Sequence, residues 1–235
     1  MMFPVAILAG GLATRLHPIT ETIPKALVEV AGLPFIIRQL SYLRDQGISH
    51  VVLCVGYLGN MIREVVGTGE SSGLNIRYSE DGPNLLGTGG ALTKAIPLLG
   101  DKFFVLYGDS FLPLNFSAVQ AAYQFSKQPA LMTILKNQNQ WDNSNVLFLE
   151  GELLEYNKRM PRSDMTHIDY GLSVISASVL EQNIVGQSFD LADVYQYLSL
   201  QRQLAGLEVH ERFYEIGSHK GLKETEEYFL TKEKL

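Results

Sequence analysis

Short apolar segments alternate with helix-like segments through the first half of the chain. The first apolar segment, residues 3–9, is followed directly by Gly10 and Gly11. A run this short and this apolar predicts a strand buried on both faces, and therefore a place in the middle of a sheet. Residues 34–47 come next and carry apolar side chains at the spacing of one helical face. Strand and helix alternate in this way as far as Asp109, which predicts βαβ units around a mostly parallel sheet.

The remaining elements follow from the same patterns. In the first half, strands are expected at residues 48–55, 74–79 and 103–107, and helices at residues 58–66 and 89–99. In the second half, strands are expected at residues 131–135, 146–149, 153–156 and 171–175, and helices at residues 116–125, 191–204 and 222–230. The second half is less regular, so antiparallel strands are expected there. The predicted fold class is α/β, with a doubly wound, mostly parallel mixed sheet flanked by helices.

Charge and hydropathy exclude several classes of protein. The chain carries 19 Lys and Arg against 25 Asp and Glu, a formal charge of −6, without a basic run that could follow a nucleic-acid backbone. Its apolar stretches, such as residues 51–55, fall far short of the ~20 residues that span a bilayer, and no basic residue precedes Arg15 to begin a signal peptide. We therefore expect a soluble cytoplasmic protein that binds neither nucleic acid nor membrane. Residues 1–235 are expected to form one domain, compatible with a monomer or a homo-oligomer.

The turn after the first strand could bind an anion. Gly10 and Gly11 allow the backbone to approach a ligand and to point N–H groups at it. Arg15 offers a planar fork for phosphate oxygens, and Lys25 adds a mobile point charge. The alternative is a tight turn followed by two solvated cations. The segment has neither the spacing of a P-loop nor that of G-x-G-x-x-G, so kinases and dehydrogenases are disfavoured.

Six segments together resemble the sugar-1-phosphate nucleotidyltransferases, in particular hexose and heptose 1-phosphate guanylyltransferases. Residues 10–16 with Pro24-Lys25 resemble that family's Gly-Gly-x-(Ala or Gly)-Thr-Arg-Leu signature followed by Pro-Lys, and residues 86–91 resemble its Leu-Gly-Thr-Ala-Gly-Ala element. The other matching segments are residues 108–109, 156–158, 168–171 and 215–217. They span nearly the whole chain in the family's order. The resemblance implies a Rossmann-like fold.

The resemblance also implies a reaction and a set of residues. The expected substrates are a sugar 1-phosphate and a nucleoside triphosphate, which give a nucleoside-diphosphate sugar and pyrophosphate with Mg²⁺ as cofactor. The implied catalytic residues are Arg15, Lys25 and Asp109, and the implied metal ligands are Asp109 and Glu215. The implied nucleotide-binding residues are Leu8, Ala9, Gly10, Gly11, Thr14, Arg15, Glu80, Gly87 and Thr88. The implied sugar-phosphate-binding residues are Asn157, Lys158, Asp169 and Gly171. Such a transfer depends mainly on positioning and charge neutralisation, which explains why cations and carboxylates occur together.

Three of these positions have alternative interpretations. Asp109 ends an expected strand, where a Mg²⁺ ligand would suit the sheet, but Asp is also a favoured helix N-cap. Glu215 stands where the family usually has Asp, and Asn157 stands where many members have an acidic residue. A Glu can bind the same ion with one extra methylene. These departures leave open a protein that binds nucleotide sugars for regulation and has a degenerate metal site. A glycosyltransferase is less consistent, because Asp109 lacks the second Asp of a D-x-D motif.

Glu80 is the candidate for reading the nucleotide base. It follows an expected strand and precedes the segment that resembles the family's base-contacting loop. A carboxylate accepts hydrogen bonds only, and guanine presents two adjacent donors whereas uracil and thymine present one between two carbonyls. The sequence therefore slightly favours GTP. The alternative is a solvated glutamate in a turn, with the base held by loop backbone alone.

Overall fold

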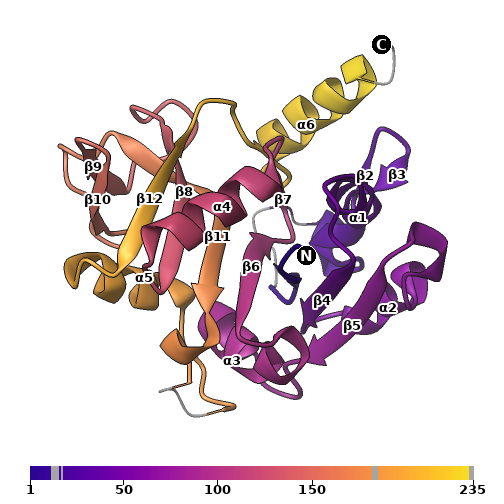
Figure 1. Cartoon of the computed structure of the whole chain (residues 1–235). Coiled ribbons are helices and arrows are strands. Elements are labelled where there is room, and N and C mark those ends of the chain that lie inside the picture. Colours follow the sequence, from indigo (N-terminus) through magenta and orange to yellow (C-terminus); the bar gives the residue numbers. More distant parts are fainter. Residues whose placement is uncertain (12–15, 17, 182–184, 233–235) are drawn as a thin grey trace.

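A mixed sheet forms the centre of the protein, and its parallel half comes from the first part of the chain (Figure 1). The computed structural model describes residues 1–11, 16, 18–181 and 185–232. The parallel strands are β1 (Val5–Leu8), β4 (His50–Val55), β5 (Asn75–Glu80) and β6 (Lys102–Tyr107), in the order β6-β1-β4-β5. Val5 pairs with Val51 on one side and with Phe104 on the other. The first strand therefore lies mid-sheet, as its apolar sequence predicts.

The second part of the chain extends the same sheet with mostly antiparallel strands. These are β8 (Ala130–Lys136), β9 (Val146–Leu149), β10 (Glu152–Tyr156), β11 (His167–Ser176) and β12 (Leu204–Val209). The long strand β11 lies antiparallel to both β6 and β8, and β12 runs parallel to β8. Because β11 joins the two halves, the carboxyl end of β6 lies beside the middle of β11, where Leu106 pairs with Leu172.

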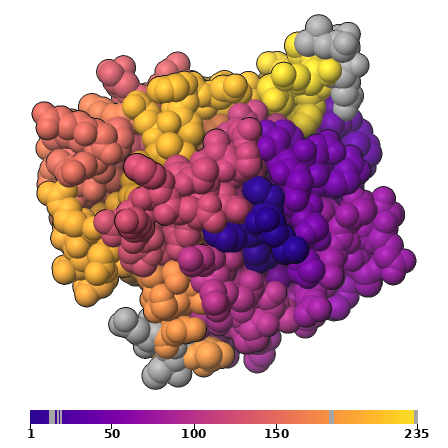
Figure 2. Space-filling view, in the orientation of Figure 1, coloured from indigo at the N-terminus to yellow at the C-terminus, as the bar shows by residue number. Residues whose placement is uncertain are grey.

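Helices cover both faces of the sheet. Five of them are α1 (Phe35–Asp45), α2 (Gly59–Val66), α3 (Gly87–Leu99), α4 (Phe116–Ser126) and α5 (Leu191–Leu200). Helices α1, α2 and α4 share one apolar cluster, and α3 and α5 share another. Strand β1 supplies both, since Val5 and Ile7 belong to the first cluster and Ala6 to the second. Figure 2 shows the N-terminal residues at the surface beside α4, where Phe3 N–H donates to Gln120 at 2.8 Å.

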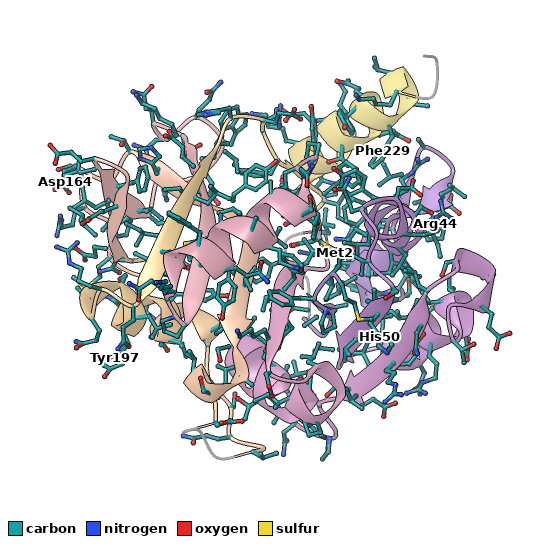
Figure 3. The ribbon with its side chains drawn as sticks, viewed as in Figure 1. Met2, Arg44, His50, Asp164, Tyr197 and Phe229 are labelled. Carbon is teal, nitrogen blue, oxygen red and sulfur yellow. The ribbon has the colours of Figure 1, made fainter. Side chains whose placement is uncertain are left out.

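A third apolar cluster holds the C-terminal helix against the body. Helix α6 (His219–Lys232) follows strand β13 (Tyr214–Glu215), which pairs with β7 (Ser110–Phe111). Phe229 of α6, labelled in Figure 3, packs on Phe111 and under the guanidinium of Arg38. A small hairpin, β2 (Glu29–Val30) and β3 (Leu33–Pro34), completes the cluster. The short 3₁₀ turns are η2 (Ile19–Glu21), η3 (Lys25–Leu27), η4 (Glu70–Ser72) and η5 (Ala177–Val179).

The structure confirms the predicted α/β class and corrects part of the second half. The helix expected at residues 191–204 ends at Leu200, and Leu204 begins strand β12. Arg202 has a positive φ of 57° at this break. The strand expected at residues 171–175 begins earlier, at His167. No helix among the described residues is long and apolar enough to cross a membrane.

Candidate active site

Glycines lie at the carboxyl ends of β1, β4 and β6, where the backbones crowd together. An ideal Cβ on Gly10 would lie 3.0 Å from the nitrogen of Gly56, and one on Gly108 would lie 2.9 Å from the carbonyl oxygen of Leu8. At these two positions the neighbouring backbone leaves no room for a side chain. A pocket of about 250 Å³ opens beyond these strand ends, where ligands of such sheets bind.

The pocket brings together many of the residues that the sequence selects. Its lining includes Leu8, Ala9, Gly10, Gly11, Lys25, Gly87, Thr88 and Asp109. These residues come from the end of β1, from η3, from the start of α3 and from the end of β6. The predicted ligands Thr14 and Arg15 lie outside the described residues.

Lys25 and Asp109 form an ion pair at one side of the pocket. Lys25 Nζ lies 2.9 Å from Asp109 Oδ2, and both side chains are partly buried. Asp109 is followed by strand β7, and the next helix, α4, is capped by Asn115. The helix-cap interpretation of Asp109 is therefore wrong. Its carboxylate is held by Lys25 and by the hydroxyl of Ser110 at 3.2 Å.

Glu215 lies beside Asp109 although 106 positions separate them in the sequence. The N–H of Ile216 donates to the carbonyl of Asp109 at 2.9 Å, and Glu215 pairs with Ser110 between β13 and β7. The Glu215 carboxylate accepts from the N–H of Gly217 and from the hydroxyl of Ser218. These donors fix its direction.

Gly217 marks the point on which the three charged groups converge. An ideal Cβ on Gly217 would lie 2.7 Å from a Glu215 carboxylate oxygen, 3.4 Å from Lys25 Nζ and 3.5 Å from Asp109 Oδ2. Two carboxylates fit Mg²⁺, which commonly takes one or two protein carboxylates and completes its shell with water and substrate phosphate. Among the described residues no group of three or more His, Cys, Asp or Glu side chains could hold a metal. Asp109 and Glu215 are two neighbouring carboxylates that could hold such an ion.

The base side of the pocket contains Asp81 instead of Glu80. The Glu80 carboxylate is half exposed and pairs with Arg63 on helix α2, and the pocket lining does not include it. Asp81 lines the pocket and accepts a hydrogen bond from the N–H of Leu86 at 3.1 Å. Burial raises the pKa of Asp81 above its ordinary value. Sequence reasoning missed Asp81 because it ended the strand at residue 79, whereas β5 includes Glu80.

Asp169 and Gly171 lie at an irregular point of β11. The pairing with β8 shifts between Asp169 and Ser173, and Gly171 has a φ of 104°. Gly171 N–H donates to Asp169 Oδ1 at 2.9 Å. Burial raises the pKa of Asp169 to about 6, against the opposing effects of the Gly171 N–H and the charge of Lys158. The Asp169 charge in turn raises the pKa of Tyr107, which is already raised by burial and which lines the pocket.

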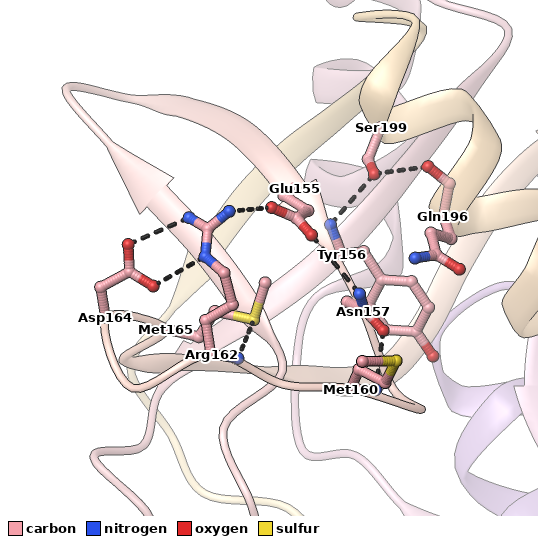
Figure 4. Close-up of polar contacts among 9 residues, drawn as sticks. All are labelled: Glu155, Tyr156, Asn157, Met160, Arg162, Asp164, Met165, Gln196 and Ser199. Carbon is pink, nitrogen blue, oxygen red and sulfur yellow. Dashed lines mark hydrogen bonds and ion pairs between the residues drawn. The ribbon is translucent and has the colours of Figure 1, made fainter.

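The loop after β10 holds Asn157 in local hydrogen bonds (Figure 4). Asn157 Oδ1 accepts from the N–H of Met160 at 2.9 Å, and Asn157 Nδ2 donates to Glu155 at 3.4 Å. Arg162 bridges Glu155 and Asp164 in the same loop. Asn157 thus shapes the loop in which Lys158 lies. The resemblance of residues 156–158 predicts that Asn157 binds the sugar phosphate, and that role stays a prediction.

Comparisons with known proteins give one family match and several relatives. The sequence model of the family described as Nucleotidyl transferase matches residues 5–144. An N-acetylmuramate alpha-1-phosphate uridylyltransferase from Neisseria meningitidis serogroup B is 39% identical over 113 residues, which are 48% of this chain and 49% of that protein. A D-glycero-alpha-D-manno-heptose 1-phosphate guanylyltransferase from Campylobacter jejuni is 35% identical over 137 residues, 58% of each chain.

Longer but weaker similarities extend over the rest of the chain. The mannose-1-phosphate guanylyltransferase catalytic subunit beta of Xenopus tropicalis is 26% identical over 91% of this chain and 61% of its own length. The chain thus covers about half to three fifths of the curated relatives that it matches. The crystal structure of HddC from Yersinia pseudotuberculosis complexed with GMP-PN has the same fold, with a TM-score of 0.81 at 24% identity over 97% of this chain and 100% of that one. The chain belongs to the nucleotidyl transferase family.

Proposed function

We propose that the protein joins a sugar 1-phosphate to a nucleoside triphosphate and releases pyrophosphate. A phosphate oxygen of the sugar 1-phosphate attacks the α-phosphorus, a new P–O bond forms, and the bond to the β-phosphate oxygen breaks. The products are a nucleoside-diphosphate sugar and pyrophosphate, and the reaction needs no further reactant. The names of the relatives support these substrate classes. We further propose that residues 1–235 act as one domain, because β11 joins both halves in one sheet.

The observation that carries this proposal is the convergence of Lys25, Asp109 and Glu215 at the edge of the pocket. The transfer brings several phosphate oxygens together, and its rate depends on positioning and on charge stabilisation. Lys25 supplies a cation beside the reacting phosphate, and Asp109 holds Lys25 in place. Bound Mg²⁺ would neutralise charge on the phosphates and on the developing pyrophosphate. Arg15, by the resemblance, is proposed to bind the triphosphate.

The remaining proposed contacts divide between the two substrates. Glycines after β1 and at the start of α3 leave room for the nucleotide, and Asp81 takes the place that the sequence gave to Glu80 as the reader of the base. A carboxylate acceptor there favours guanine. Lys158 and Asp169 are proposed to hold the sugar phosphate and a sugar hydroxyl. Glu215 keeps a carboxylate beside Asp109, which weakens the reason for assuming a degenerate metal site.

A substrate panel tests the proposal. GTP, UTP, dTTP and CTP are each combined with mannose, glucose and heptose 1-phosphates in the presence of Mg²⁺, and pyrophosphate release is measured together with product identity. We expect release that requires both substrates and that yields the nucleoside-diphosphate sugar. Release from a triphosphate without a sugar phosphate indicates hydrolysis and contradicts the proposal. Consumption of a nucleoside-diphosphate sugar with transfer to an acceptor would indicate a glycosyltransferase instead.

A further inference from the structure

A short segment before α5 lies across the start of α3. This segment, residues 187–191, is called the strap below. Phe189 N–H donates to the carbonyl of Leu86 at 3.1 Å, and Gly89 N–H donates to the carbonyl of Phe189 at 3.0 Å. An ideal Cβ on Gly87 would lie 2.5 Å from the Phe189 carbonyl oxygen, and one on Gly90 would overlap that of Gln187. Gly87 and Gly90, which belong to the segment that resembles a ligand-binding element, therefore also leave room for the strap.

Asp190 connects the strap to the nucleotide pocket through Thr88. Asp190 Oδ1 accepts from the hydroxyl of Thr88 at 2.8 Å and from the N–H of Ala192 at 3.0 Å. The oxygen of Thr88 accepts from the N–H of Leu191 at 2.8 Å. Thr88 lines the pocket, but its hydroxyl proton points to Asp190. Thr88 is thus held by the strap and does not donate that proton to a ligand.

Asp190 also faces the cations on the sugar-phosphate side. Burial alone would raise the pKa of Asp190, but the hydrogen bonds from Ala192 and Thr88 act in the opposite direction. The positive charges of Lys158 and Arg159 add to them, so that the pKa of Asp190 lies below its ordinary value. Asp190 is therefore an anion at neutral pH, and its charge acts on Lys158 as well as on Thr88.

We propose that Asp190 is a positioning residue, which fixes Thr88 at the wall of the nucleotide pocket. This inference rests on the proposed function. Nucleotidyl transfer needs the attacking oxygen in line with the α-phosphorus, and a displacement of 1 Å can lower a rate on the order of a hundredfold. A group that fixes Thr88 from outside the pocket can set that alignment without touching either substrate.

The test replaces Asp190 by Asn. Asn is as good an N-cap as Asp, and its oxygen can accept from Ala192 and Thr88, so that helix α5 should be preserved. We expect kcat for the best substrate pair to fall severalfold, because a neutral amide oxygen holds the Thr88 hydroxyl more weakly than a carboxylate does. The KM values for both substrates should change little, because Asp190 positions Thr88 without touching either substrate. A purely structural role would lower the melting temperature and raise both KM values.

Asp193→Asn is the matched control. Asp193 lies one turn further along α5 and forms an ion pair with Arg159 at 2.6 Å. It is therefore also a carboxylate beside a cation of this side, but the hydrogen bond from Thr88 goes to Asp190. Thr88→Val removes the hydroxyl altogether and should lower kcat further, by about tenfold or more, whereas Thr88→Ser should keep the rate, since serine keeps the hydroxyl. Equal kinetics for Asp190→Asn and Asp193→Asn overturn this inference alone. A wild-type protein that turns over no pair in the substrate panel overturns the proposed function and this inference with it.

Discussion

The ring of Phe189 occupies the space that a side chain on Gly89 would need, since an ideal Cβ on Gly89 would overlap that ring. Residues 86–91 resemble the family's Leu-Gly-Thr-Ala-Gly-Ala element, which carries alanine at the position of Gly89. Here the missing side chain allows Phe189 to lie on the first turn of α3, where its carbonyl accepts the N–H of Gly89. Gly89 thus contributes, together with Gly87 and Gly90, to the contact between α3 and the strap.

Gly89→Ala should therefore destabilise the protein although alanine is the better helix former. Helix propensity favours alanine by about 0.5–1 kcal/mol, whereas overpacking costs about 1–3 kcal/mol. The net effect should appear in urea unfolding as a lower midpoint at an unchanged slope. Phe189→Ala makes room, so Gly89→Ala should cost less in that background. A more stable Gly89→Ala single variant would show that the ring moves away freely.

Asp109→Asn should reduce pyrophosphate release at limiting Mg²⁺ by at least ~10²-fold, the scale of losing one electrostatic element of an active site. The amide keeps the shape but loses the charge that binds a divalent ion and pairs with Lys25. Mg²⁺ titrations of the wild type and the variant measure this effect. Asp45→Asn is the control, since Asp45 forms an exposed pair with Arg44 on α1. Wild-type turnover by Asp109→Asn at limiting Mg²⁺ would remove Asp109 from the proposed metal site.

Asp81→Asn should reduce the preference for GTP. A hydrogen bond to a charged group contributes about 1.5–3 kcal/mol, so kcat/KM for GTP relative to UTP should fall about tenfold or more. Glu80→Gln is a neighbouring control of the same chemistry, because Glu80 pairs with Arg63. Values of kcat/KM for the four triphosphates test both variants. A wild-type preference for UTP or dTTP, or a larger effect of Glu80→Gln, would contradict the assignment.

Asp169→Asn should stabilise the protein at pH 7.5 more than at pH 5. Burial raises the pKa of Asp169 from 3.8 to about 6, so the folded state holds this proton more tightly than the unfolded chain. That contribution to stability is fully present below the unfolded-state pKa and is lost as the pH rises through the folded-state pKa. Asparagine resembles the protonated acid at every pH.

The difference in unfolding free energy between the wild type and Asp169→Asn, measured at both pH values, tests this expectation. Asp164→Asn is the control: the hydrogen bond from Arg162 lowers the pKa of Asp164, so this carboxylate is ionised at both pH values and the effect of the variant should be the same at both. If the difference in unfolding free energy between the wild type and Asp169→Asn is the same at pH 5 and pH 7.5, burial does not raise the pKa of Asp169.

The second half of the chain shows where sequence patterns lose their predictive power. Leu191, Leu198 and Leu204 suit a continuous helix, yet the helix stops at Leu200 and residues 204–209 pair with β8. The hydrogen bonds that make β12 a strand come from residues more than 70 positions away, which a local pattern does not contain. The end of β5 is a smaller case. Strand β5 extends one residue further than the sequence predicts and ends at Glu80. Glu80 forms an ion pair with Arg63, and Asp81, the next residue, lines the pocket.

The sequence by itself determined the fold class and the glycine turn that lines the pocket, because strand burial on both faces and Gly10-Gly11 before Lys25 are local patterns. The tertiary structure decided which charged groups meet. Lys25, Asp109 and Glu215 come from three distant segments, and Thr88 and Asp190 are 102 positions apart. Their convergence depends on strand order and on the glycines that let backbones approach. The physical reason is that the periodicity of a sequence shows which side of a helix or strand is buried. It does not show which strand ends lie next to each other in the sheet, and the candidate site forms at those ends.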